Sequence, residues 1–233
     1  MFHFKQFSLS DDKSAMKIGT DAVLLGSWVE IESVHRILDV GTGSGIIALM
    51  MAQRTQARID AVEIDAVTAE QANSNFAISP WAERIHIHIS SVQHFAALHH
   101  SAYDLIISNP PFFANSLKSP DPNRSIARHN DSLPVNEFMQ SADRLLNDHG
   151  KLTVIIPAEK SKSWIMEASI FDFVHTRCMN IIPRKGKPVH RVMMEFCRNG
   201  LQPAEEEILE ILDTDGKYTE NYKRLTSEFY LGL

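Results

Sequence analysis

The sequence predicts an α/β fold in which a doubly wound, mostly parallel sheet of seven strands carries helices on both faces and ends in an antiparallel hairpin. Apolar, β-rich runs alternate with helix-like segments through the first two-thirds of the chain, as they do where crossover helices join parallel strands. Near the C-terminus two more such runs are joined by residues 183–189, a connection too short to contain a helix. These two runs should therefore pair antiparallel.

Seven runs have the composition of strands. In chain order they are residues 36–40, 58–63, 84–89, 103–108, 151–156, 171–182 and 190–197. Helices are expected at residues 45–54, 66–78 and 135–147, and the last should close at Gly150 as a helix C-terminus would. The segment from Glu205 onward is ambiguous and is consistent with an amphipathic stretch packed on the sheet.

Length and composition indicate one domain over residues 1–233, with an N-terminal extension at residues 1–30 and a C-terminal appendage at residues 201–233. A hydrophobic content of 44% and a charged content of 22% are typical of soluble proteins. No apolar run approaches the roughly 20 residues that cross a bilayer, and the N-terminus lacks a secretory signal. Cys178 and Cys197 are too few for a disulfide framework, and no metal-binding spacing is present. We therefore expect a cytoplasmic protein with no membrane span and no metal.

The formal net charge is −6, so the field of the whole molecule would repel a polyanion and any binding of nucleic acid has to be local. Two basic clusters are candidate RNA contacts, or else solvated charges that only aid solubility. They comprise Lys118, Arg124, Arg128 and His129 in one cluster and Arg184, Lys185, Lys187 and Arg191 in the other.

A glycine-rich turn, Asp39-Val40-Gly41-Thr42-Gly43-Ser44-Gly45, joins the first predicted strand to the first predicted helix. Ligands bind at this position in doubly wound folds. The glycine spacing differs from G-x-G-x-x-G, because Ile46 occupies the place of the third glycine, and this argues against NAD(P). No lysine follows in the pattern of a phosphate-binding loop, so a nucleoside triphosphate is also disfavoured.

Acidic residues accompany this turn. Glu63 ends the second predicted strand about 20 residues further on, where a carboxylate can accept hydrogen bonds from ribose hydroxyls. Asp65 is better placed to cap the following helix. Asp39 either binds an ammonium group of the cofactor or orients the glycine turn. The predicted cofactor is S-adenosylmethionine, and its candidate ligands here are Asp39, Gly41, Thr42, Gly43, Gly45 and Glu63.

The tetrapeptide Asn109-Pro110-Pro111-Phe112 follows the fourth predicted strand and indicates methyl transfer to a planar nitrogen. Such a nitrogen is a poor nucleophile, because its lone pair is delocalised until the nitrogen becomes pyramidal. The Asn109 side-chain oxygen and the Pro110 carbonyl can each accept one N–H and so favour the transition state. Proline holds these acceptors in place, since it restricts its own φ and the conformation of the preceding residue.

The longest stretch without a clear period runs from residue 113 to residue 133 and is rich in Ser, Asn, Asp and Pro. Long irregular loops are usually functional or disordered. Because this one starts at the tetrapeptide, we expect a substrate lid, with ordinary surface disorder as the alternative.

With both motifs the chain resembles the class I, Rossmann-like methyltransferases that methylate amino groups with S-adenosylmethionine, in which the tetrapeptide reads Asn/Asp-Pro-Pro-aromatic. It is more similar still to the tRNA N6-adenine methyltransferases that modify the adenosine 3′ of the anticodon in a valine tRNA. Residues 15–21, 124–129 and 218–231 carry this closer resemblance.

The resemblance implies a tRNA substrate and a cofactor that also touches Asn109. It further implies that Lys17, Thr20 and Asp21 lie near the mouth of the cofactor pocket, although Thr20-Asp21 could equally begin a helix. Related enzymes often have an acidic residue at the end of the third strand, where this chain has Ser90-Ser91. Ser91 would then bind adenine through its hydroxyl or its backbone N–H.

The expected mechanism extrudes the target adenine from the RNA and stacks it on Phe112. No general base is required, because the methylated nitrogen is strongly acidic until it loses its proton. The histidines at positions 86, 88, 94, 99 and 100 are therefore interpreted as surface residues.

Three other functions share these motifs. A protein methyltransferase acting on a glutamine amide meets the same planar nitrogen, and so does a methyltransferase acting on N2 of guanine in ribosomal RNA. A binding protein that keeps the fold without turnover is the third, and the intact Asn109, Pro110 and Glu63 weigh against it.

Overall fold

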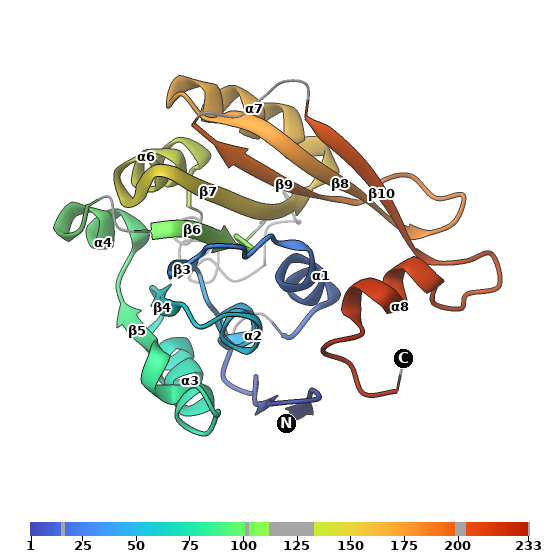
Figure 1. The fold of residues 1–233 in the computed structure, drawn as a ribbon, viewed down its shortest axis with the longest axis horizontal. Helices are drawn as coiled ribbons and strands as arrows, with labels where there is room; N and C mark the ends of the chain where they lie inside the picture. Colours follow the sequence, from blue (N-terminus) through green and yellow to red (C-terminus); the bar gives the residue numbers. More distant parts are fainter. Residues whose placement is uncertain (15–16, 101–102, 112–132, 199–203, 233) are drawn as a thin grey trace, which may run out of the picture.

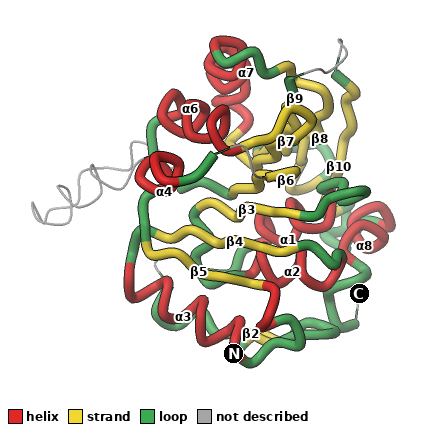
Figure 2. Tube along the Cα trace, turned by 60° about the vertical axis from the view of Figure 1, so that its left-hand side comes forward, coloured by secondary structure: helices red, strands yellow, loops and turns green. Residues whose placement is uncertain are grey.

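The computed structural model describes residues 1–14, 17–100, 103–111, 133–198 and 204–232. In this part of the chain an eight-stranded sheet has the order β10-β8-β9-β7-β6-β3-β4-β5 and carries helices on both faces (Figures 1 and 2). Its strands are β3 (Arg36–Val40), β4 (Arg58–Glu63), β5 (Ile85–Ile89), β6 (Tyr103–Ser108), β7 (Leu146–Pro157), β8 (Val174–Arg184), β9 (Arg191–Cys197) and β10 (Glu205–Leu212). The short strands β1 (Phe2–His3) and β2 (Ser8–Leu9) form a separate antiparallel pair.

The predicted doubly wound, mostly parallel sheet is confirmed, and so is the antiparallel hairpin. β9 runs antiparallel to both of its neighbours, β7 and β8, and all other neighbouring pairs of this sheet are parallel. The expected number of seven strands was one too low, because β10 pairs in parallel with β8. Three successive glutamates begin β10 and hide its strand character, but Glu207 is held by Arg177 of β8 at 2.8 Å and Leu209 is buried.

Two apolar cores lie on opposite faces of the sheet. The first contains side chains from α1 (Thr20–Trp28), α2 (Ile46–Arg54), α3 (Ala66–Ala77) and α8 (Glu220–Thr226). The second contains side chains from α4 (Val92–Leu98), α6 (Val135–Leu145) and α7 (Ser161–Ile170). The helices α4, α7 and α8 were not among the expected segments, whereas α1 begins at Thr20, where a helix start was one of two interpretations. No helix of the described residues combines the length and the apolar composition needed to cross a membrane.

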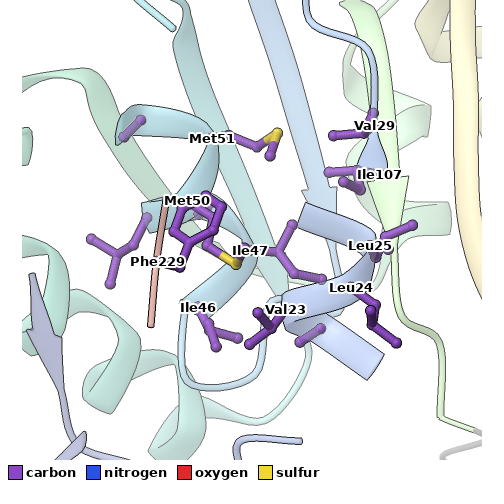
Figure 3. Packing of buried hydrophobic residues seen from close by; sticks show 14 of the residues in the cluster. Val23, Leu24, Leu25, Val29, Ile46, Ile47, Met50, Met51, Ile107 and Phe229 are labelled. Carbon is purple, nitrogen blue, oxygen red and sulfur yellow. The ribbon is translucent and has the colours of Figure 1, made fainter. Parts of the chain in front are cut away.

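Helices α1 and α2 pack closely in the first core (Figure 3). Ile46 through Ala52 are all buried, so α2 is enclosed on every side, as expected for a helix that is apolar all round. Gly26 permits this contact, because a Cβ atom there would lie 2.7 Å from Sδ of Met50. The N-terminal residues Phe4, Phe7 and Leu9 join the same core.

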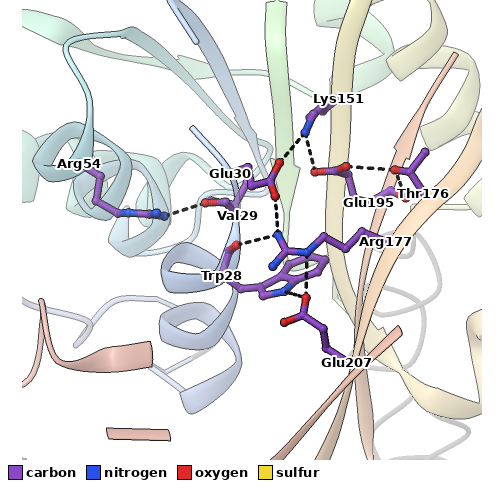
Figure 4. A network of polar contacts seen from close by, with 9 residues as sticks. All are labelled: Trp28, Val29, Glu30, Arg54, Lys151, Thr176, Arg177, Glu195 and Glu207. Atoms are coloured by element: carbon purple, nitrogen blue, oxygen red, sulfur yellow. Dashed lines mark hydrogen bonds and ion pairs between the residues drawn. The ribbon is translucent and has the colours of Figure 1, made fainter. Parts of the chain in front are cut away.

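A charged network fastens the end of α1 to the far half of the sheet (Figure 4). The guanidinium of Arg177 lies 4.4 Å from the ring centre of Trp28 and donates to Glu207 and Glu30. Lys151 bridges Glu30, at 2.8 Å, and the buried Glu195, at 3.2 Å. These contacts hold α1 against strands β7 to β10.

Gly150 does not end a helix as expected. Helix α6 stops at Leu145 and β7 begins at the next residue, so Gly150 lies within the strand. Glycine is required there because a Cβ would come within 2.8 Å of the Tyr103 carbonyl oxygen and 2.7 Å of Cδ2 of Leu146. The pairing of β6 with β7 is irregular at this point, which brings the two backbones together.

We expect Gly150→Ala to lower the free energy of unfolding by about 1–3 kcal/mol, because the new methyl group overpacks a backbone contact that cannot move freely. Urea denaturation would measure the change. Asp148→Ala, at a 94% exposed side chain two residues away, is the control and should change stability by less than about 0.5 kcal/mol. Equal stability of the two variants would contradict this role of Gly150.

Candidate active site at the carboxyl edge of the sheet

The parallel strands deliver the predicted site residues to one edge of the sheet. β3, β4, β5 and β6 all end there, and β3 lies between β4 and β6. Val40, the last residue of β3, pairs with Ser108, the last residue of β6. The glycine turn that follows Val40 and the Asn109 loop that follows Ser108 therefore start about 5 Å apart, at one strand spacing.

Ser108 was missed by sequence reasoning and fixes this arrangement. Its side chain is fully buried, and its hydroxyl donates to the carbonyl of Val40 at 2.8 Å. A hydroxyl at the end of an otherwise apolar strand is the signal that could have identified it. Of the tetrapeptide, Asn109 and Pro111 are half-buried and Pro110 is buried. Phe112 lies outside the described residues.

The three glycines of the turn all have a positive φ, of 69° at Gly41, 58° at Gly43 and 87° at Gly45. A Cβ on Gly45 would lie 2.4 Å from the ring of Phe76, so this glycine is needed for packing at the start of α2. Apart from their chain neighbours, no atom of the described residues lies within 4 Å of a Cβ position at Gly41 or Gly43. This open space lets a ligand approach the backbone closely, as the predicted cofactor requires.

Asp39 is fully buried beneath the turn. Its Oδ2 accepts from the hydroxyl of the buried Thr42 at 2.6 Å and from the backbone N–H of Ala48 at 3.2 Å. Its other oxygen, Oδ1, is buried and has no hydrogen-bond partner in the described part of the chain. Desolvation raises the pKa of Asp39 to about 7, against the opposing effect of these hydrogen bonds. The buried oxygen that no donor reaches is a feature expected where a polar ligand completes the site.

Glu63 connects the end of β4 with the glycine turn. Its carboxylate accepts from the backbone N–H groups of Gly43 at 3.0 Å and Asp65 at 3.1 Å. Each carboxylate oxygen has lone pairs left over, so a ribose hydroxyl can still donate to Glu63. The predicted cap at Asp65 is confirmed, because its side chain accepts from the N–H of Thr68, in the first turn of α3, at 2.7 Å.

Two buried amides of α3 hold the N-terminal segment beside the glycine turn, and sequence reasoning missed both. Asn75 donates to the carbonyls of Ser10 and Ser44, each at 2.8 Å. Gln71 accepts from the backbone N–H of Lys13 at 2.9 Å and from the hydroxyl of Ser14 at 3.1 Å. Their spacing of four residues on the buried face of a helix is the signal that could have identified them.

Of the residues expected at the mouth of the cofactor pocket, two bond to other parts of the protein and one begins a helix. Lys17 donates to the backbone carbonyl of Asp11 at 2.6 Å. Thr20 is the first residue of α1, as the alternative interpretation proposed. Asp21 forms an ion pair with Arg191 at 2.8 Å. Arg191, a candidate RNA contact, is thus already paired with a carboxylate.

Ser91 follows β5 at the same edge and caps α4 by accepting from the N–H of His94 at 3.2 Å. Its hydroxyl hydrogen and its backbone N–H are the groups that could meet adenine. Ile64, which follows Glu63, is another residue that sequence reasoning missed. It is 59% exposed, which is unusual for isoleucine and gives this edge an apolar surface for the cofactor's ring.

Only some of the predicted RNA-contacting basic residues lie within the described part of the chain. Lys185 and Lys187 are exposed in the turn between β8 and β9, and no carboxylate of the described residues pairs with either. Lys118, Arg124, Arg128, His129 and the expected lid lie outside the described residues, except for Leu133.

One histidine was placed wrongly. His88 is not a simple surface residue, because it bonds to Asp60 at 2.7 Å and its ring lies 4.9 Å from that of Phe95. His86, His94, His99 and His100 are exposed, as expected. In the described part of the chain, no group of three or more His, Cys, Asp or Glu side chains is arranged to hold a metal.

The open backbone at Gly41 and Gly43, the carboxylate of Glu63 and the amide of Asn109 after β6 are compatible with a nucleoside ligand at this edge. The family profile described as methyltransferase small domain matches residues 13–180. The chain belongs to that family and is a methyltransferase.

Curated relatives extend the comparison over the whole chain. Relatives from Phocaeicola vulgatus and Aeromonas hydrophila are 43% and 42% identical, and each alignment covers 100% of this chain and 98% of the relative. One from Serratia proteamaculans is 40% identical over 99% of this chain and 89% of its own length. All three are named tRNA1(Val) (adenine(37)-N6)-methyltransferase, and this chain belongs to the same family.

Solved structures agree on the fold. A protein from Agrobacterium tumefaciens, described as a predicted O-methyltransferase, has a TM-score of 0.68 and 19% identity, covering 90% of this chain and 96% of its own. The ribosomal protein L11 methylase of Lactobacillus delbrueckii has a TM-score of 0.54 and 18% identity, covering 76% of each chain.

The raised pKa of Asp39 predicts a pH-dependent stability. In the unfolded chain an aspartate titrates at about 3.9. Because the pKa in the folded state is about 7, the stability contributed by this group is fully present below about pH 4 and is lost as the pH rises through about 7. Urea denaturation of the cofactor-free protein from about pH 5 to about pH 8 should show this loss, with a slope of at most about 1.4 kcal/mol per pH unit.

Asp39→Asn is the matched control, because asparagine keeps an oxygen that accepts from Thr42 but does not titrate. Its stability should decline less steeply over the same range. Parallel curves for the two proteins would show that Asp39 is already ionised when the protein is free.

Proposed function

We propose that this enzyme transfers a methyl group from S-adenosylmethionine to N6 of adenine 37 in a valine tRNA. The observation that carries the proposal is the pairing of Val40 with Ser108, which puts the Asn109 loop beside the glycine turn. Relatives of about 40% identity that carry this activity in their names support the choice of substrate.

The residues fit the proposed cofactor. In this proposal Glu63 binds the ribose, the backbone at Gly41 and Gly43 binds the amino-acid tail, and Asp39 binds the ammonium group through Oδ1 or a water. Ile64 and Ser91 are assigned to adenine. When bound, S-adenosylmethionine supplies an electrophilic methyl group on a positively charged sulfur.

The chain's own contribution is to change the shape of the target nitrogen. The Asn109 side-chain oxygen and the Pro110 carbonyl oxygen each accept one N–H of the exocyclic amine. These bonds strengthen as the nitrogen becomes tetrahedral, so they lower the barrier more than they stabilise the bound substrate. The excess proton leaves to water, since the methylated nitrogen is strongly acidic.

The same two acceptors explain the choice of base. A keto oxygen in place of the amine would face two oxygens with no hydrogen between them, and such unpaired polar contacts are strongly disfavoured. A stacked adenine cannot bring its N6 to this site, so the base has to leave the stack. Phe112 is proposed to stack on the extruded ring.

The proposed activity is tested by labelled methyl transfer to separate tRNA, ribosomal RNA and protein fractions, followed by identification of the modified nucleoside or amino acid. N6-methyladenosine in tRNA is the expected product. N2-methylguanosine in ribosomal RNA, or N5-methylglutamine in protein, would replace the proposal with one of the two rival activities.

Asn109→Ala should lower kcat by about 10²–10³, because it removes one acceptor that acts in the transition state. The affinity for S-adenosylhomocysteine, measured by calorimetry, should be nearly unchanged. Asn109→Asp keeps an acceptor oxygen and should retain more activity than the alanine variant. A matched loss of cofactor affinity in Asn109→Ala would instead identify Asn109 as a structural residue.

Lys185 and Lys187 should contribute to RNA affinity through charge. Removing either should reduce the slope of log Kd against log salt by about 0.7–0.9, as expected for one phosphate contact. Arg191→Ala should reduce it less, because Asp21 already neutralises this arginine. Exposed Arg58, at the start of β4 on the opposite edge, is the control and should leave the slope unchanged. A wild-type affinity that does not depend on salt would contradict the proposed phosphate contacts.

A further inference from the structure

A depression of about 320 Å³ lies between the start of α1 and the C-terminal segment, and Thr20, which is predicted at the mouth of the cofactor pocket, forms part of its wall. Four aromatic side chains line it, those of Phe2, Tyr218, Tyr222 and Tyr230. They come from the two ends of the chain, which meet where the rings of Phe2 and Tyr230 lie 6.4 Å apart, and the C-terminus lies near α8 in Figure 1. We call this group the aromatic pocket.

The pocket presents ring faces that are already held in position. Tyr218 and Tyr222 stack with their ring centres 4.7 Å apart and their planes 16° apart. Tyr222 is buried, and burial together with the neighbouring Tyr230 raises the pKa of its hydroxyl. Tyr218 is 45% exposed and Phe2 is 41% exposed, which is high for large aromatic residues. The exposed rings of Tyr218, which stacks on the buried Tyr222, and of Phe2 offer flat apolar surfaces on which a planar ligand can stack.

The topology places this pocket on the same edge as Asn109. β8 and β10 run in the same direction as β6, so Arg184 and Leu212, where these strands end, lie on the carboxyl edge. α1 begins at this edge too, because Asp21 is paired with Arg191 at the first residue of β9. β10 is four strand spacings from β6, about 19 Å. The distance is short enough for one loop of RNA to reach both places.

Positive charge borders the pocket. The turn after β8, with Lys185 and Lys187, is joined to the turn after β10 by a bond from the N–H of Lys185 to the carbonyl of Leu212 at 2.8 Å. Arg184 also donates to the carbonyl of Thr214. The second turn contains the exposed Lys217 together with the exposed Asp215, and the carboxylate of its Asp213 accepts from the backbone N–H groups of Asp215 and Lys217. The positive charge therefore comes mainly from the turn after β8.

We propose that the aromatic pocket binds an unpaired base of the tRNA, close in sequence to the methylated adenine, by stacking it against Tyr218 and Phe2 while the neighbouring lysines contact its phosphates. The inference rests on the proposed function and extends it to a second nucleotide. Stacking on aromatic rings bordered by cations is how proteins hold single-stranded nucleic acid. The cationic border favours RNA over an apolar peptide.

The test uses a tRNA transcript that the wild-type enzyme methylates, with 2-aminopurine in place of single unpaired nucleotides around the target. Binding to the wild type should quench the fluorescence at one flanking position, and Tyr218→Ala should abolish that quenching. Tyr218→Ala should also raise the Kd for tRNA about 5- to 150-fold, which corresponds to about 1–3 kcal/mol per stacked base. Tyr218→Phe keeps the ring and should restore both properties.

Several readouts separate stacking from a general loss of structure. In Tyr218→Ala, the Tm, the kcat at saturating tRNA and the affinity for S-adenosylhomocysteine should match those of the wild type. Phe2→Ala, at the second exposed ring, should weaken tRNA binding independently. Ile170→Ala, at a 68% exposed apolar side chain on α7, is the control and should change nothing.

An unchanged Kd for tRNA in both Tyr218→Ala and Phe2→Ala would overturn the inference, and so would a loss of cofactor affinity that matches the loss of tRNA affinity. Either result leaves the proposed activity intact, provided that methyl transfer to tRNA still depends on Asn109. Absence of wild-type methyl transfer to any tRNA would refute the proposed function itself and the second base site with it.

Discussion

The pairing of β3 with β6 is the constraint on which the site depends. Parallel strands end at the same edge, and the match of Val40 with Ser108 puts the glycine turn and the amide loop at neighbouring positions. A slip of one residue would turn every side chain of β6 to the opposite face and move Asn109 away from the turn. The buried hydroxyl of Ser108 bonds across this junction to Val40, so the register is held by a polar contact as well as by apolar packing.

One energetically unfavourable group, the buried carboxylate of Asp39, lies at this junction. Asp39 keeps a buried oxygen without a donor, and burial raises its pKa to about 7. Backbone with positive φ occurs at three glycines within five residues. Sites that bind ligands commonly retain such costs, which packing elsewhere offsets. Here the two cores on either side of the sheet supply that packing, and the buried amides Gln71 and Asn75 add a hydrogen-bonded support on the N-terminal side.

Local patterns were sufficient for much of the fold and for part of the site. Alternating strand and helix runs, the short connection at residues 183–189 and the cap at Asp65 each depend on neighbours in the chain, and the structure agrees with them. Features that depend on distant partners were not predictable. β10 begins with three glutamates, which in the sequence indicate a polar segment. The structure shows that Arg177 of the neighbouring strand pairs with one of them. Gly150 has the sequence context of a helix end, and only the structure shows that the Tyr103 carbonyl oxygen would lie 2.8 Å from a Cβ at this position. Likewise, the sequence does not reveal that Arg191 is paired, because its partner Asp21 is 170 residues away in the chain.

The distribution of ion pairs shows how an acidic protein can still offer a surface to RNA. At the amino edge, cations are matched with carboxylates: Lys151 contacts Glu30 and Glu195, and Arg177 contacts Glu30 and Glu207. At the carboxyl edge Arg191 is paired with Asp21, but Lys185 and Lys187 have no carboxylate partner among the described residues. The field of a polyanion is felt over about a Debye length, roughly 8 Å at physiological salt, so the local balance at an edge matters more than the net charge of −6. The direction shared by the parallel strands thus brings cofactor ligands, amide acceptors and unpaired lysines to one side of the molecule.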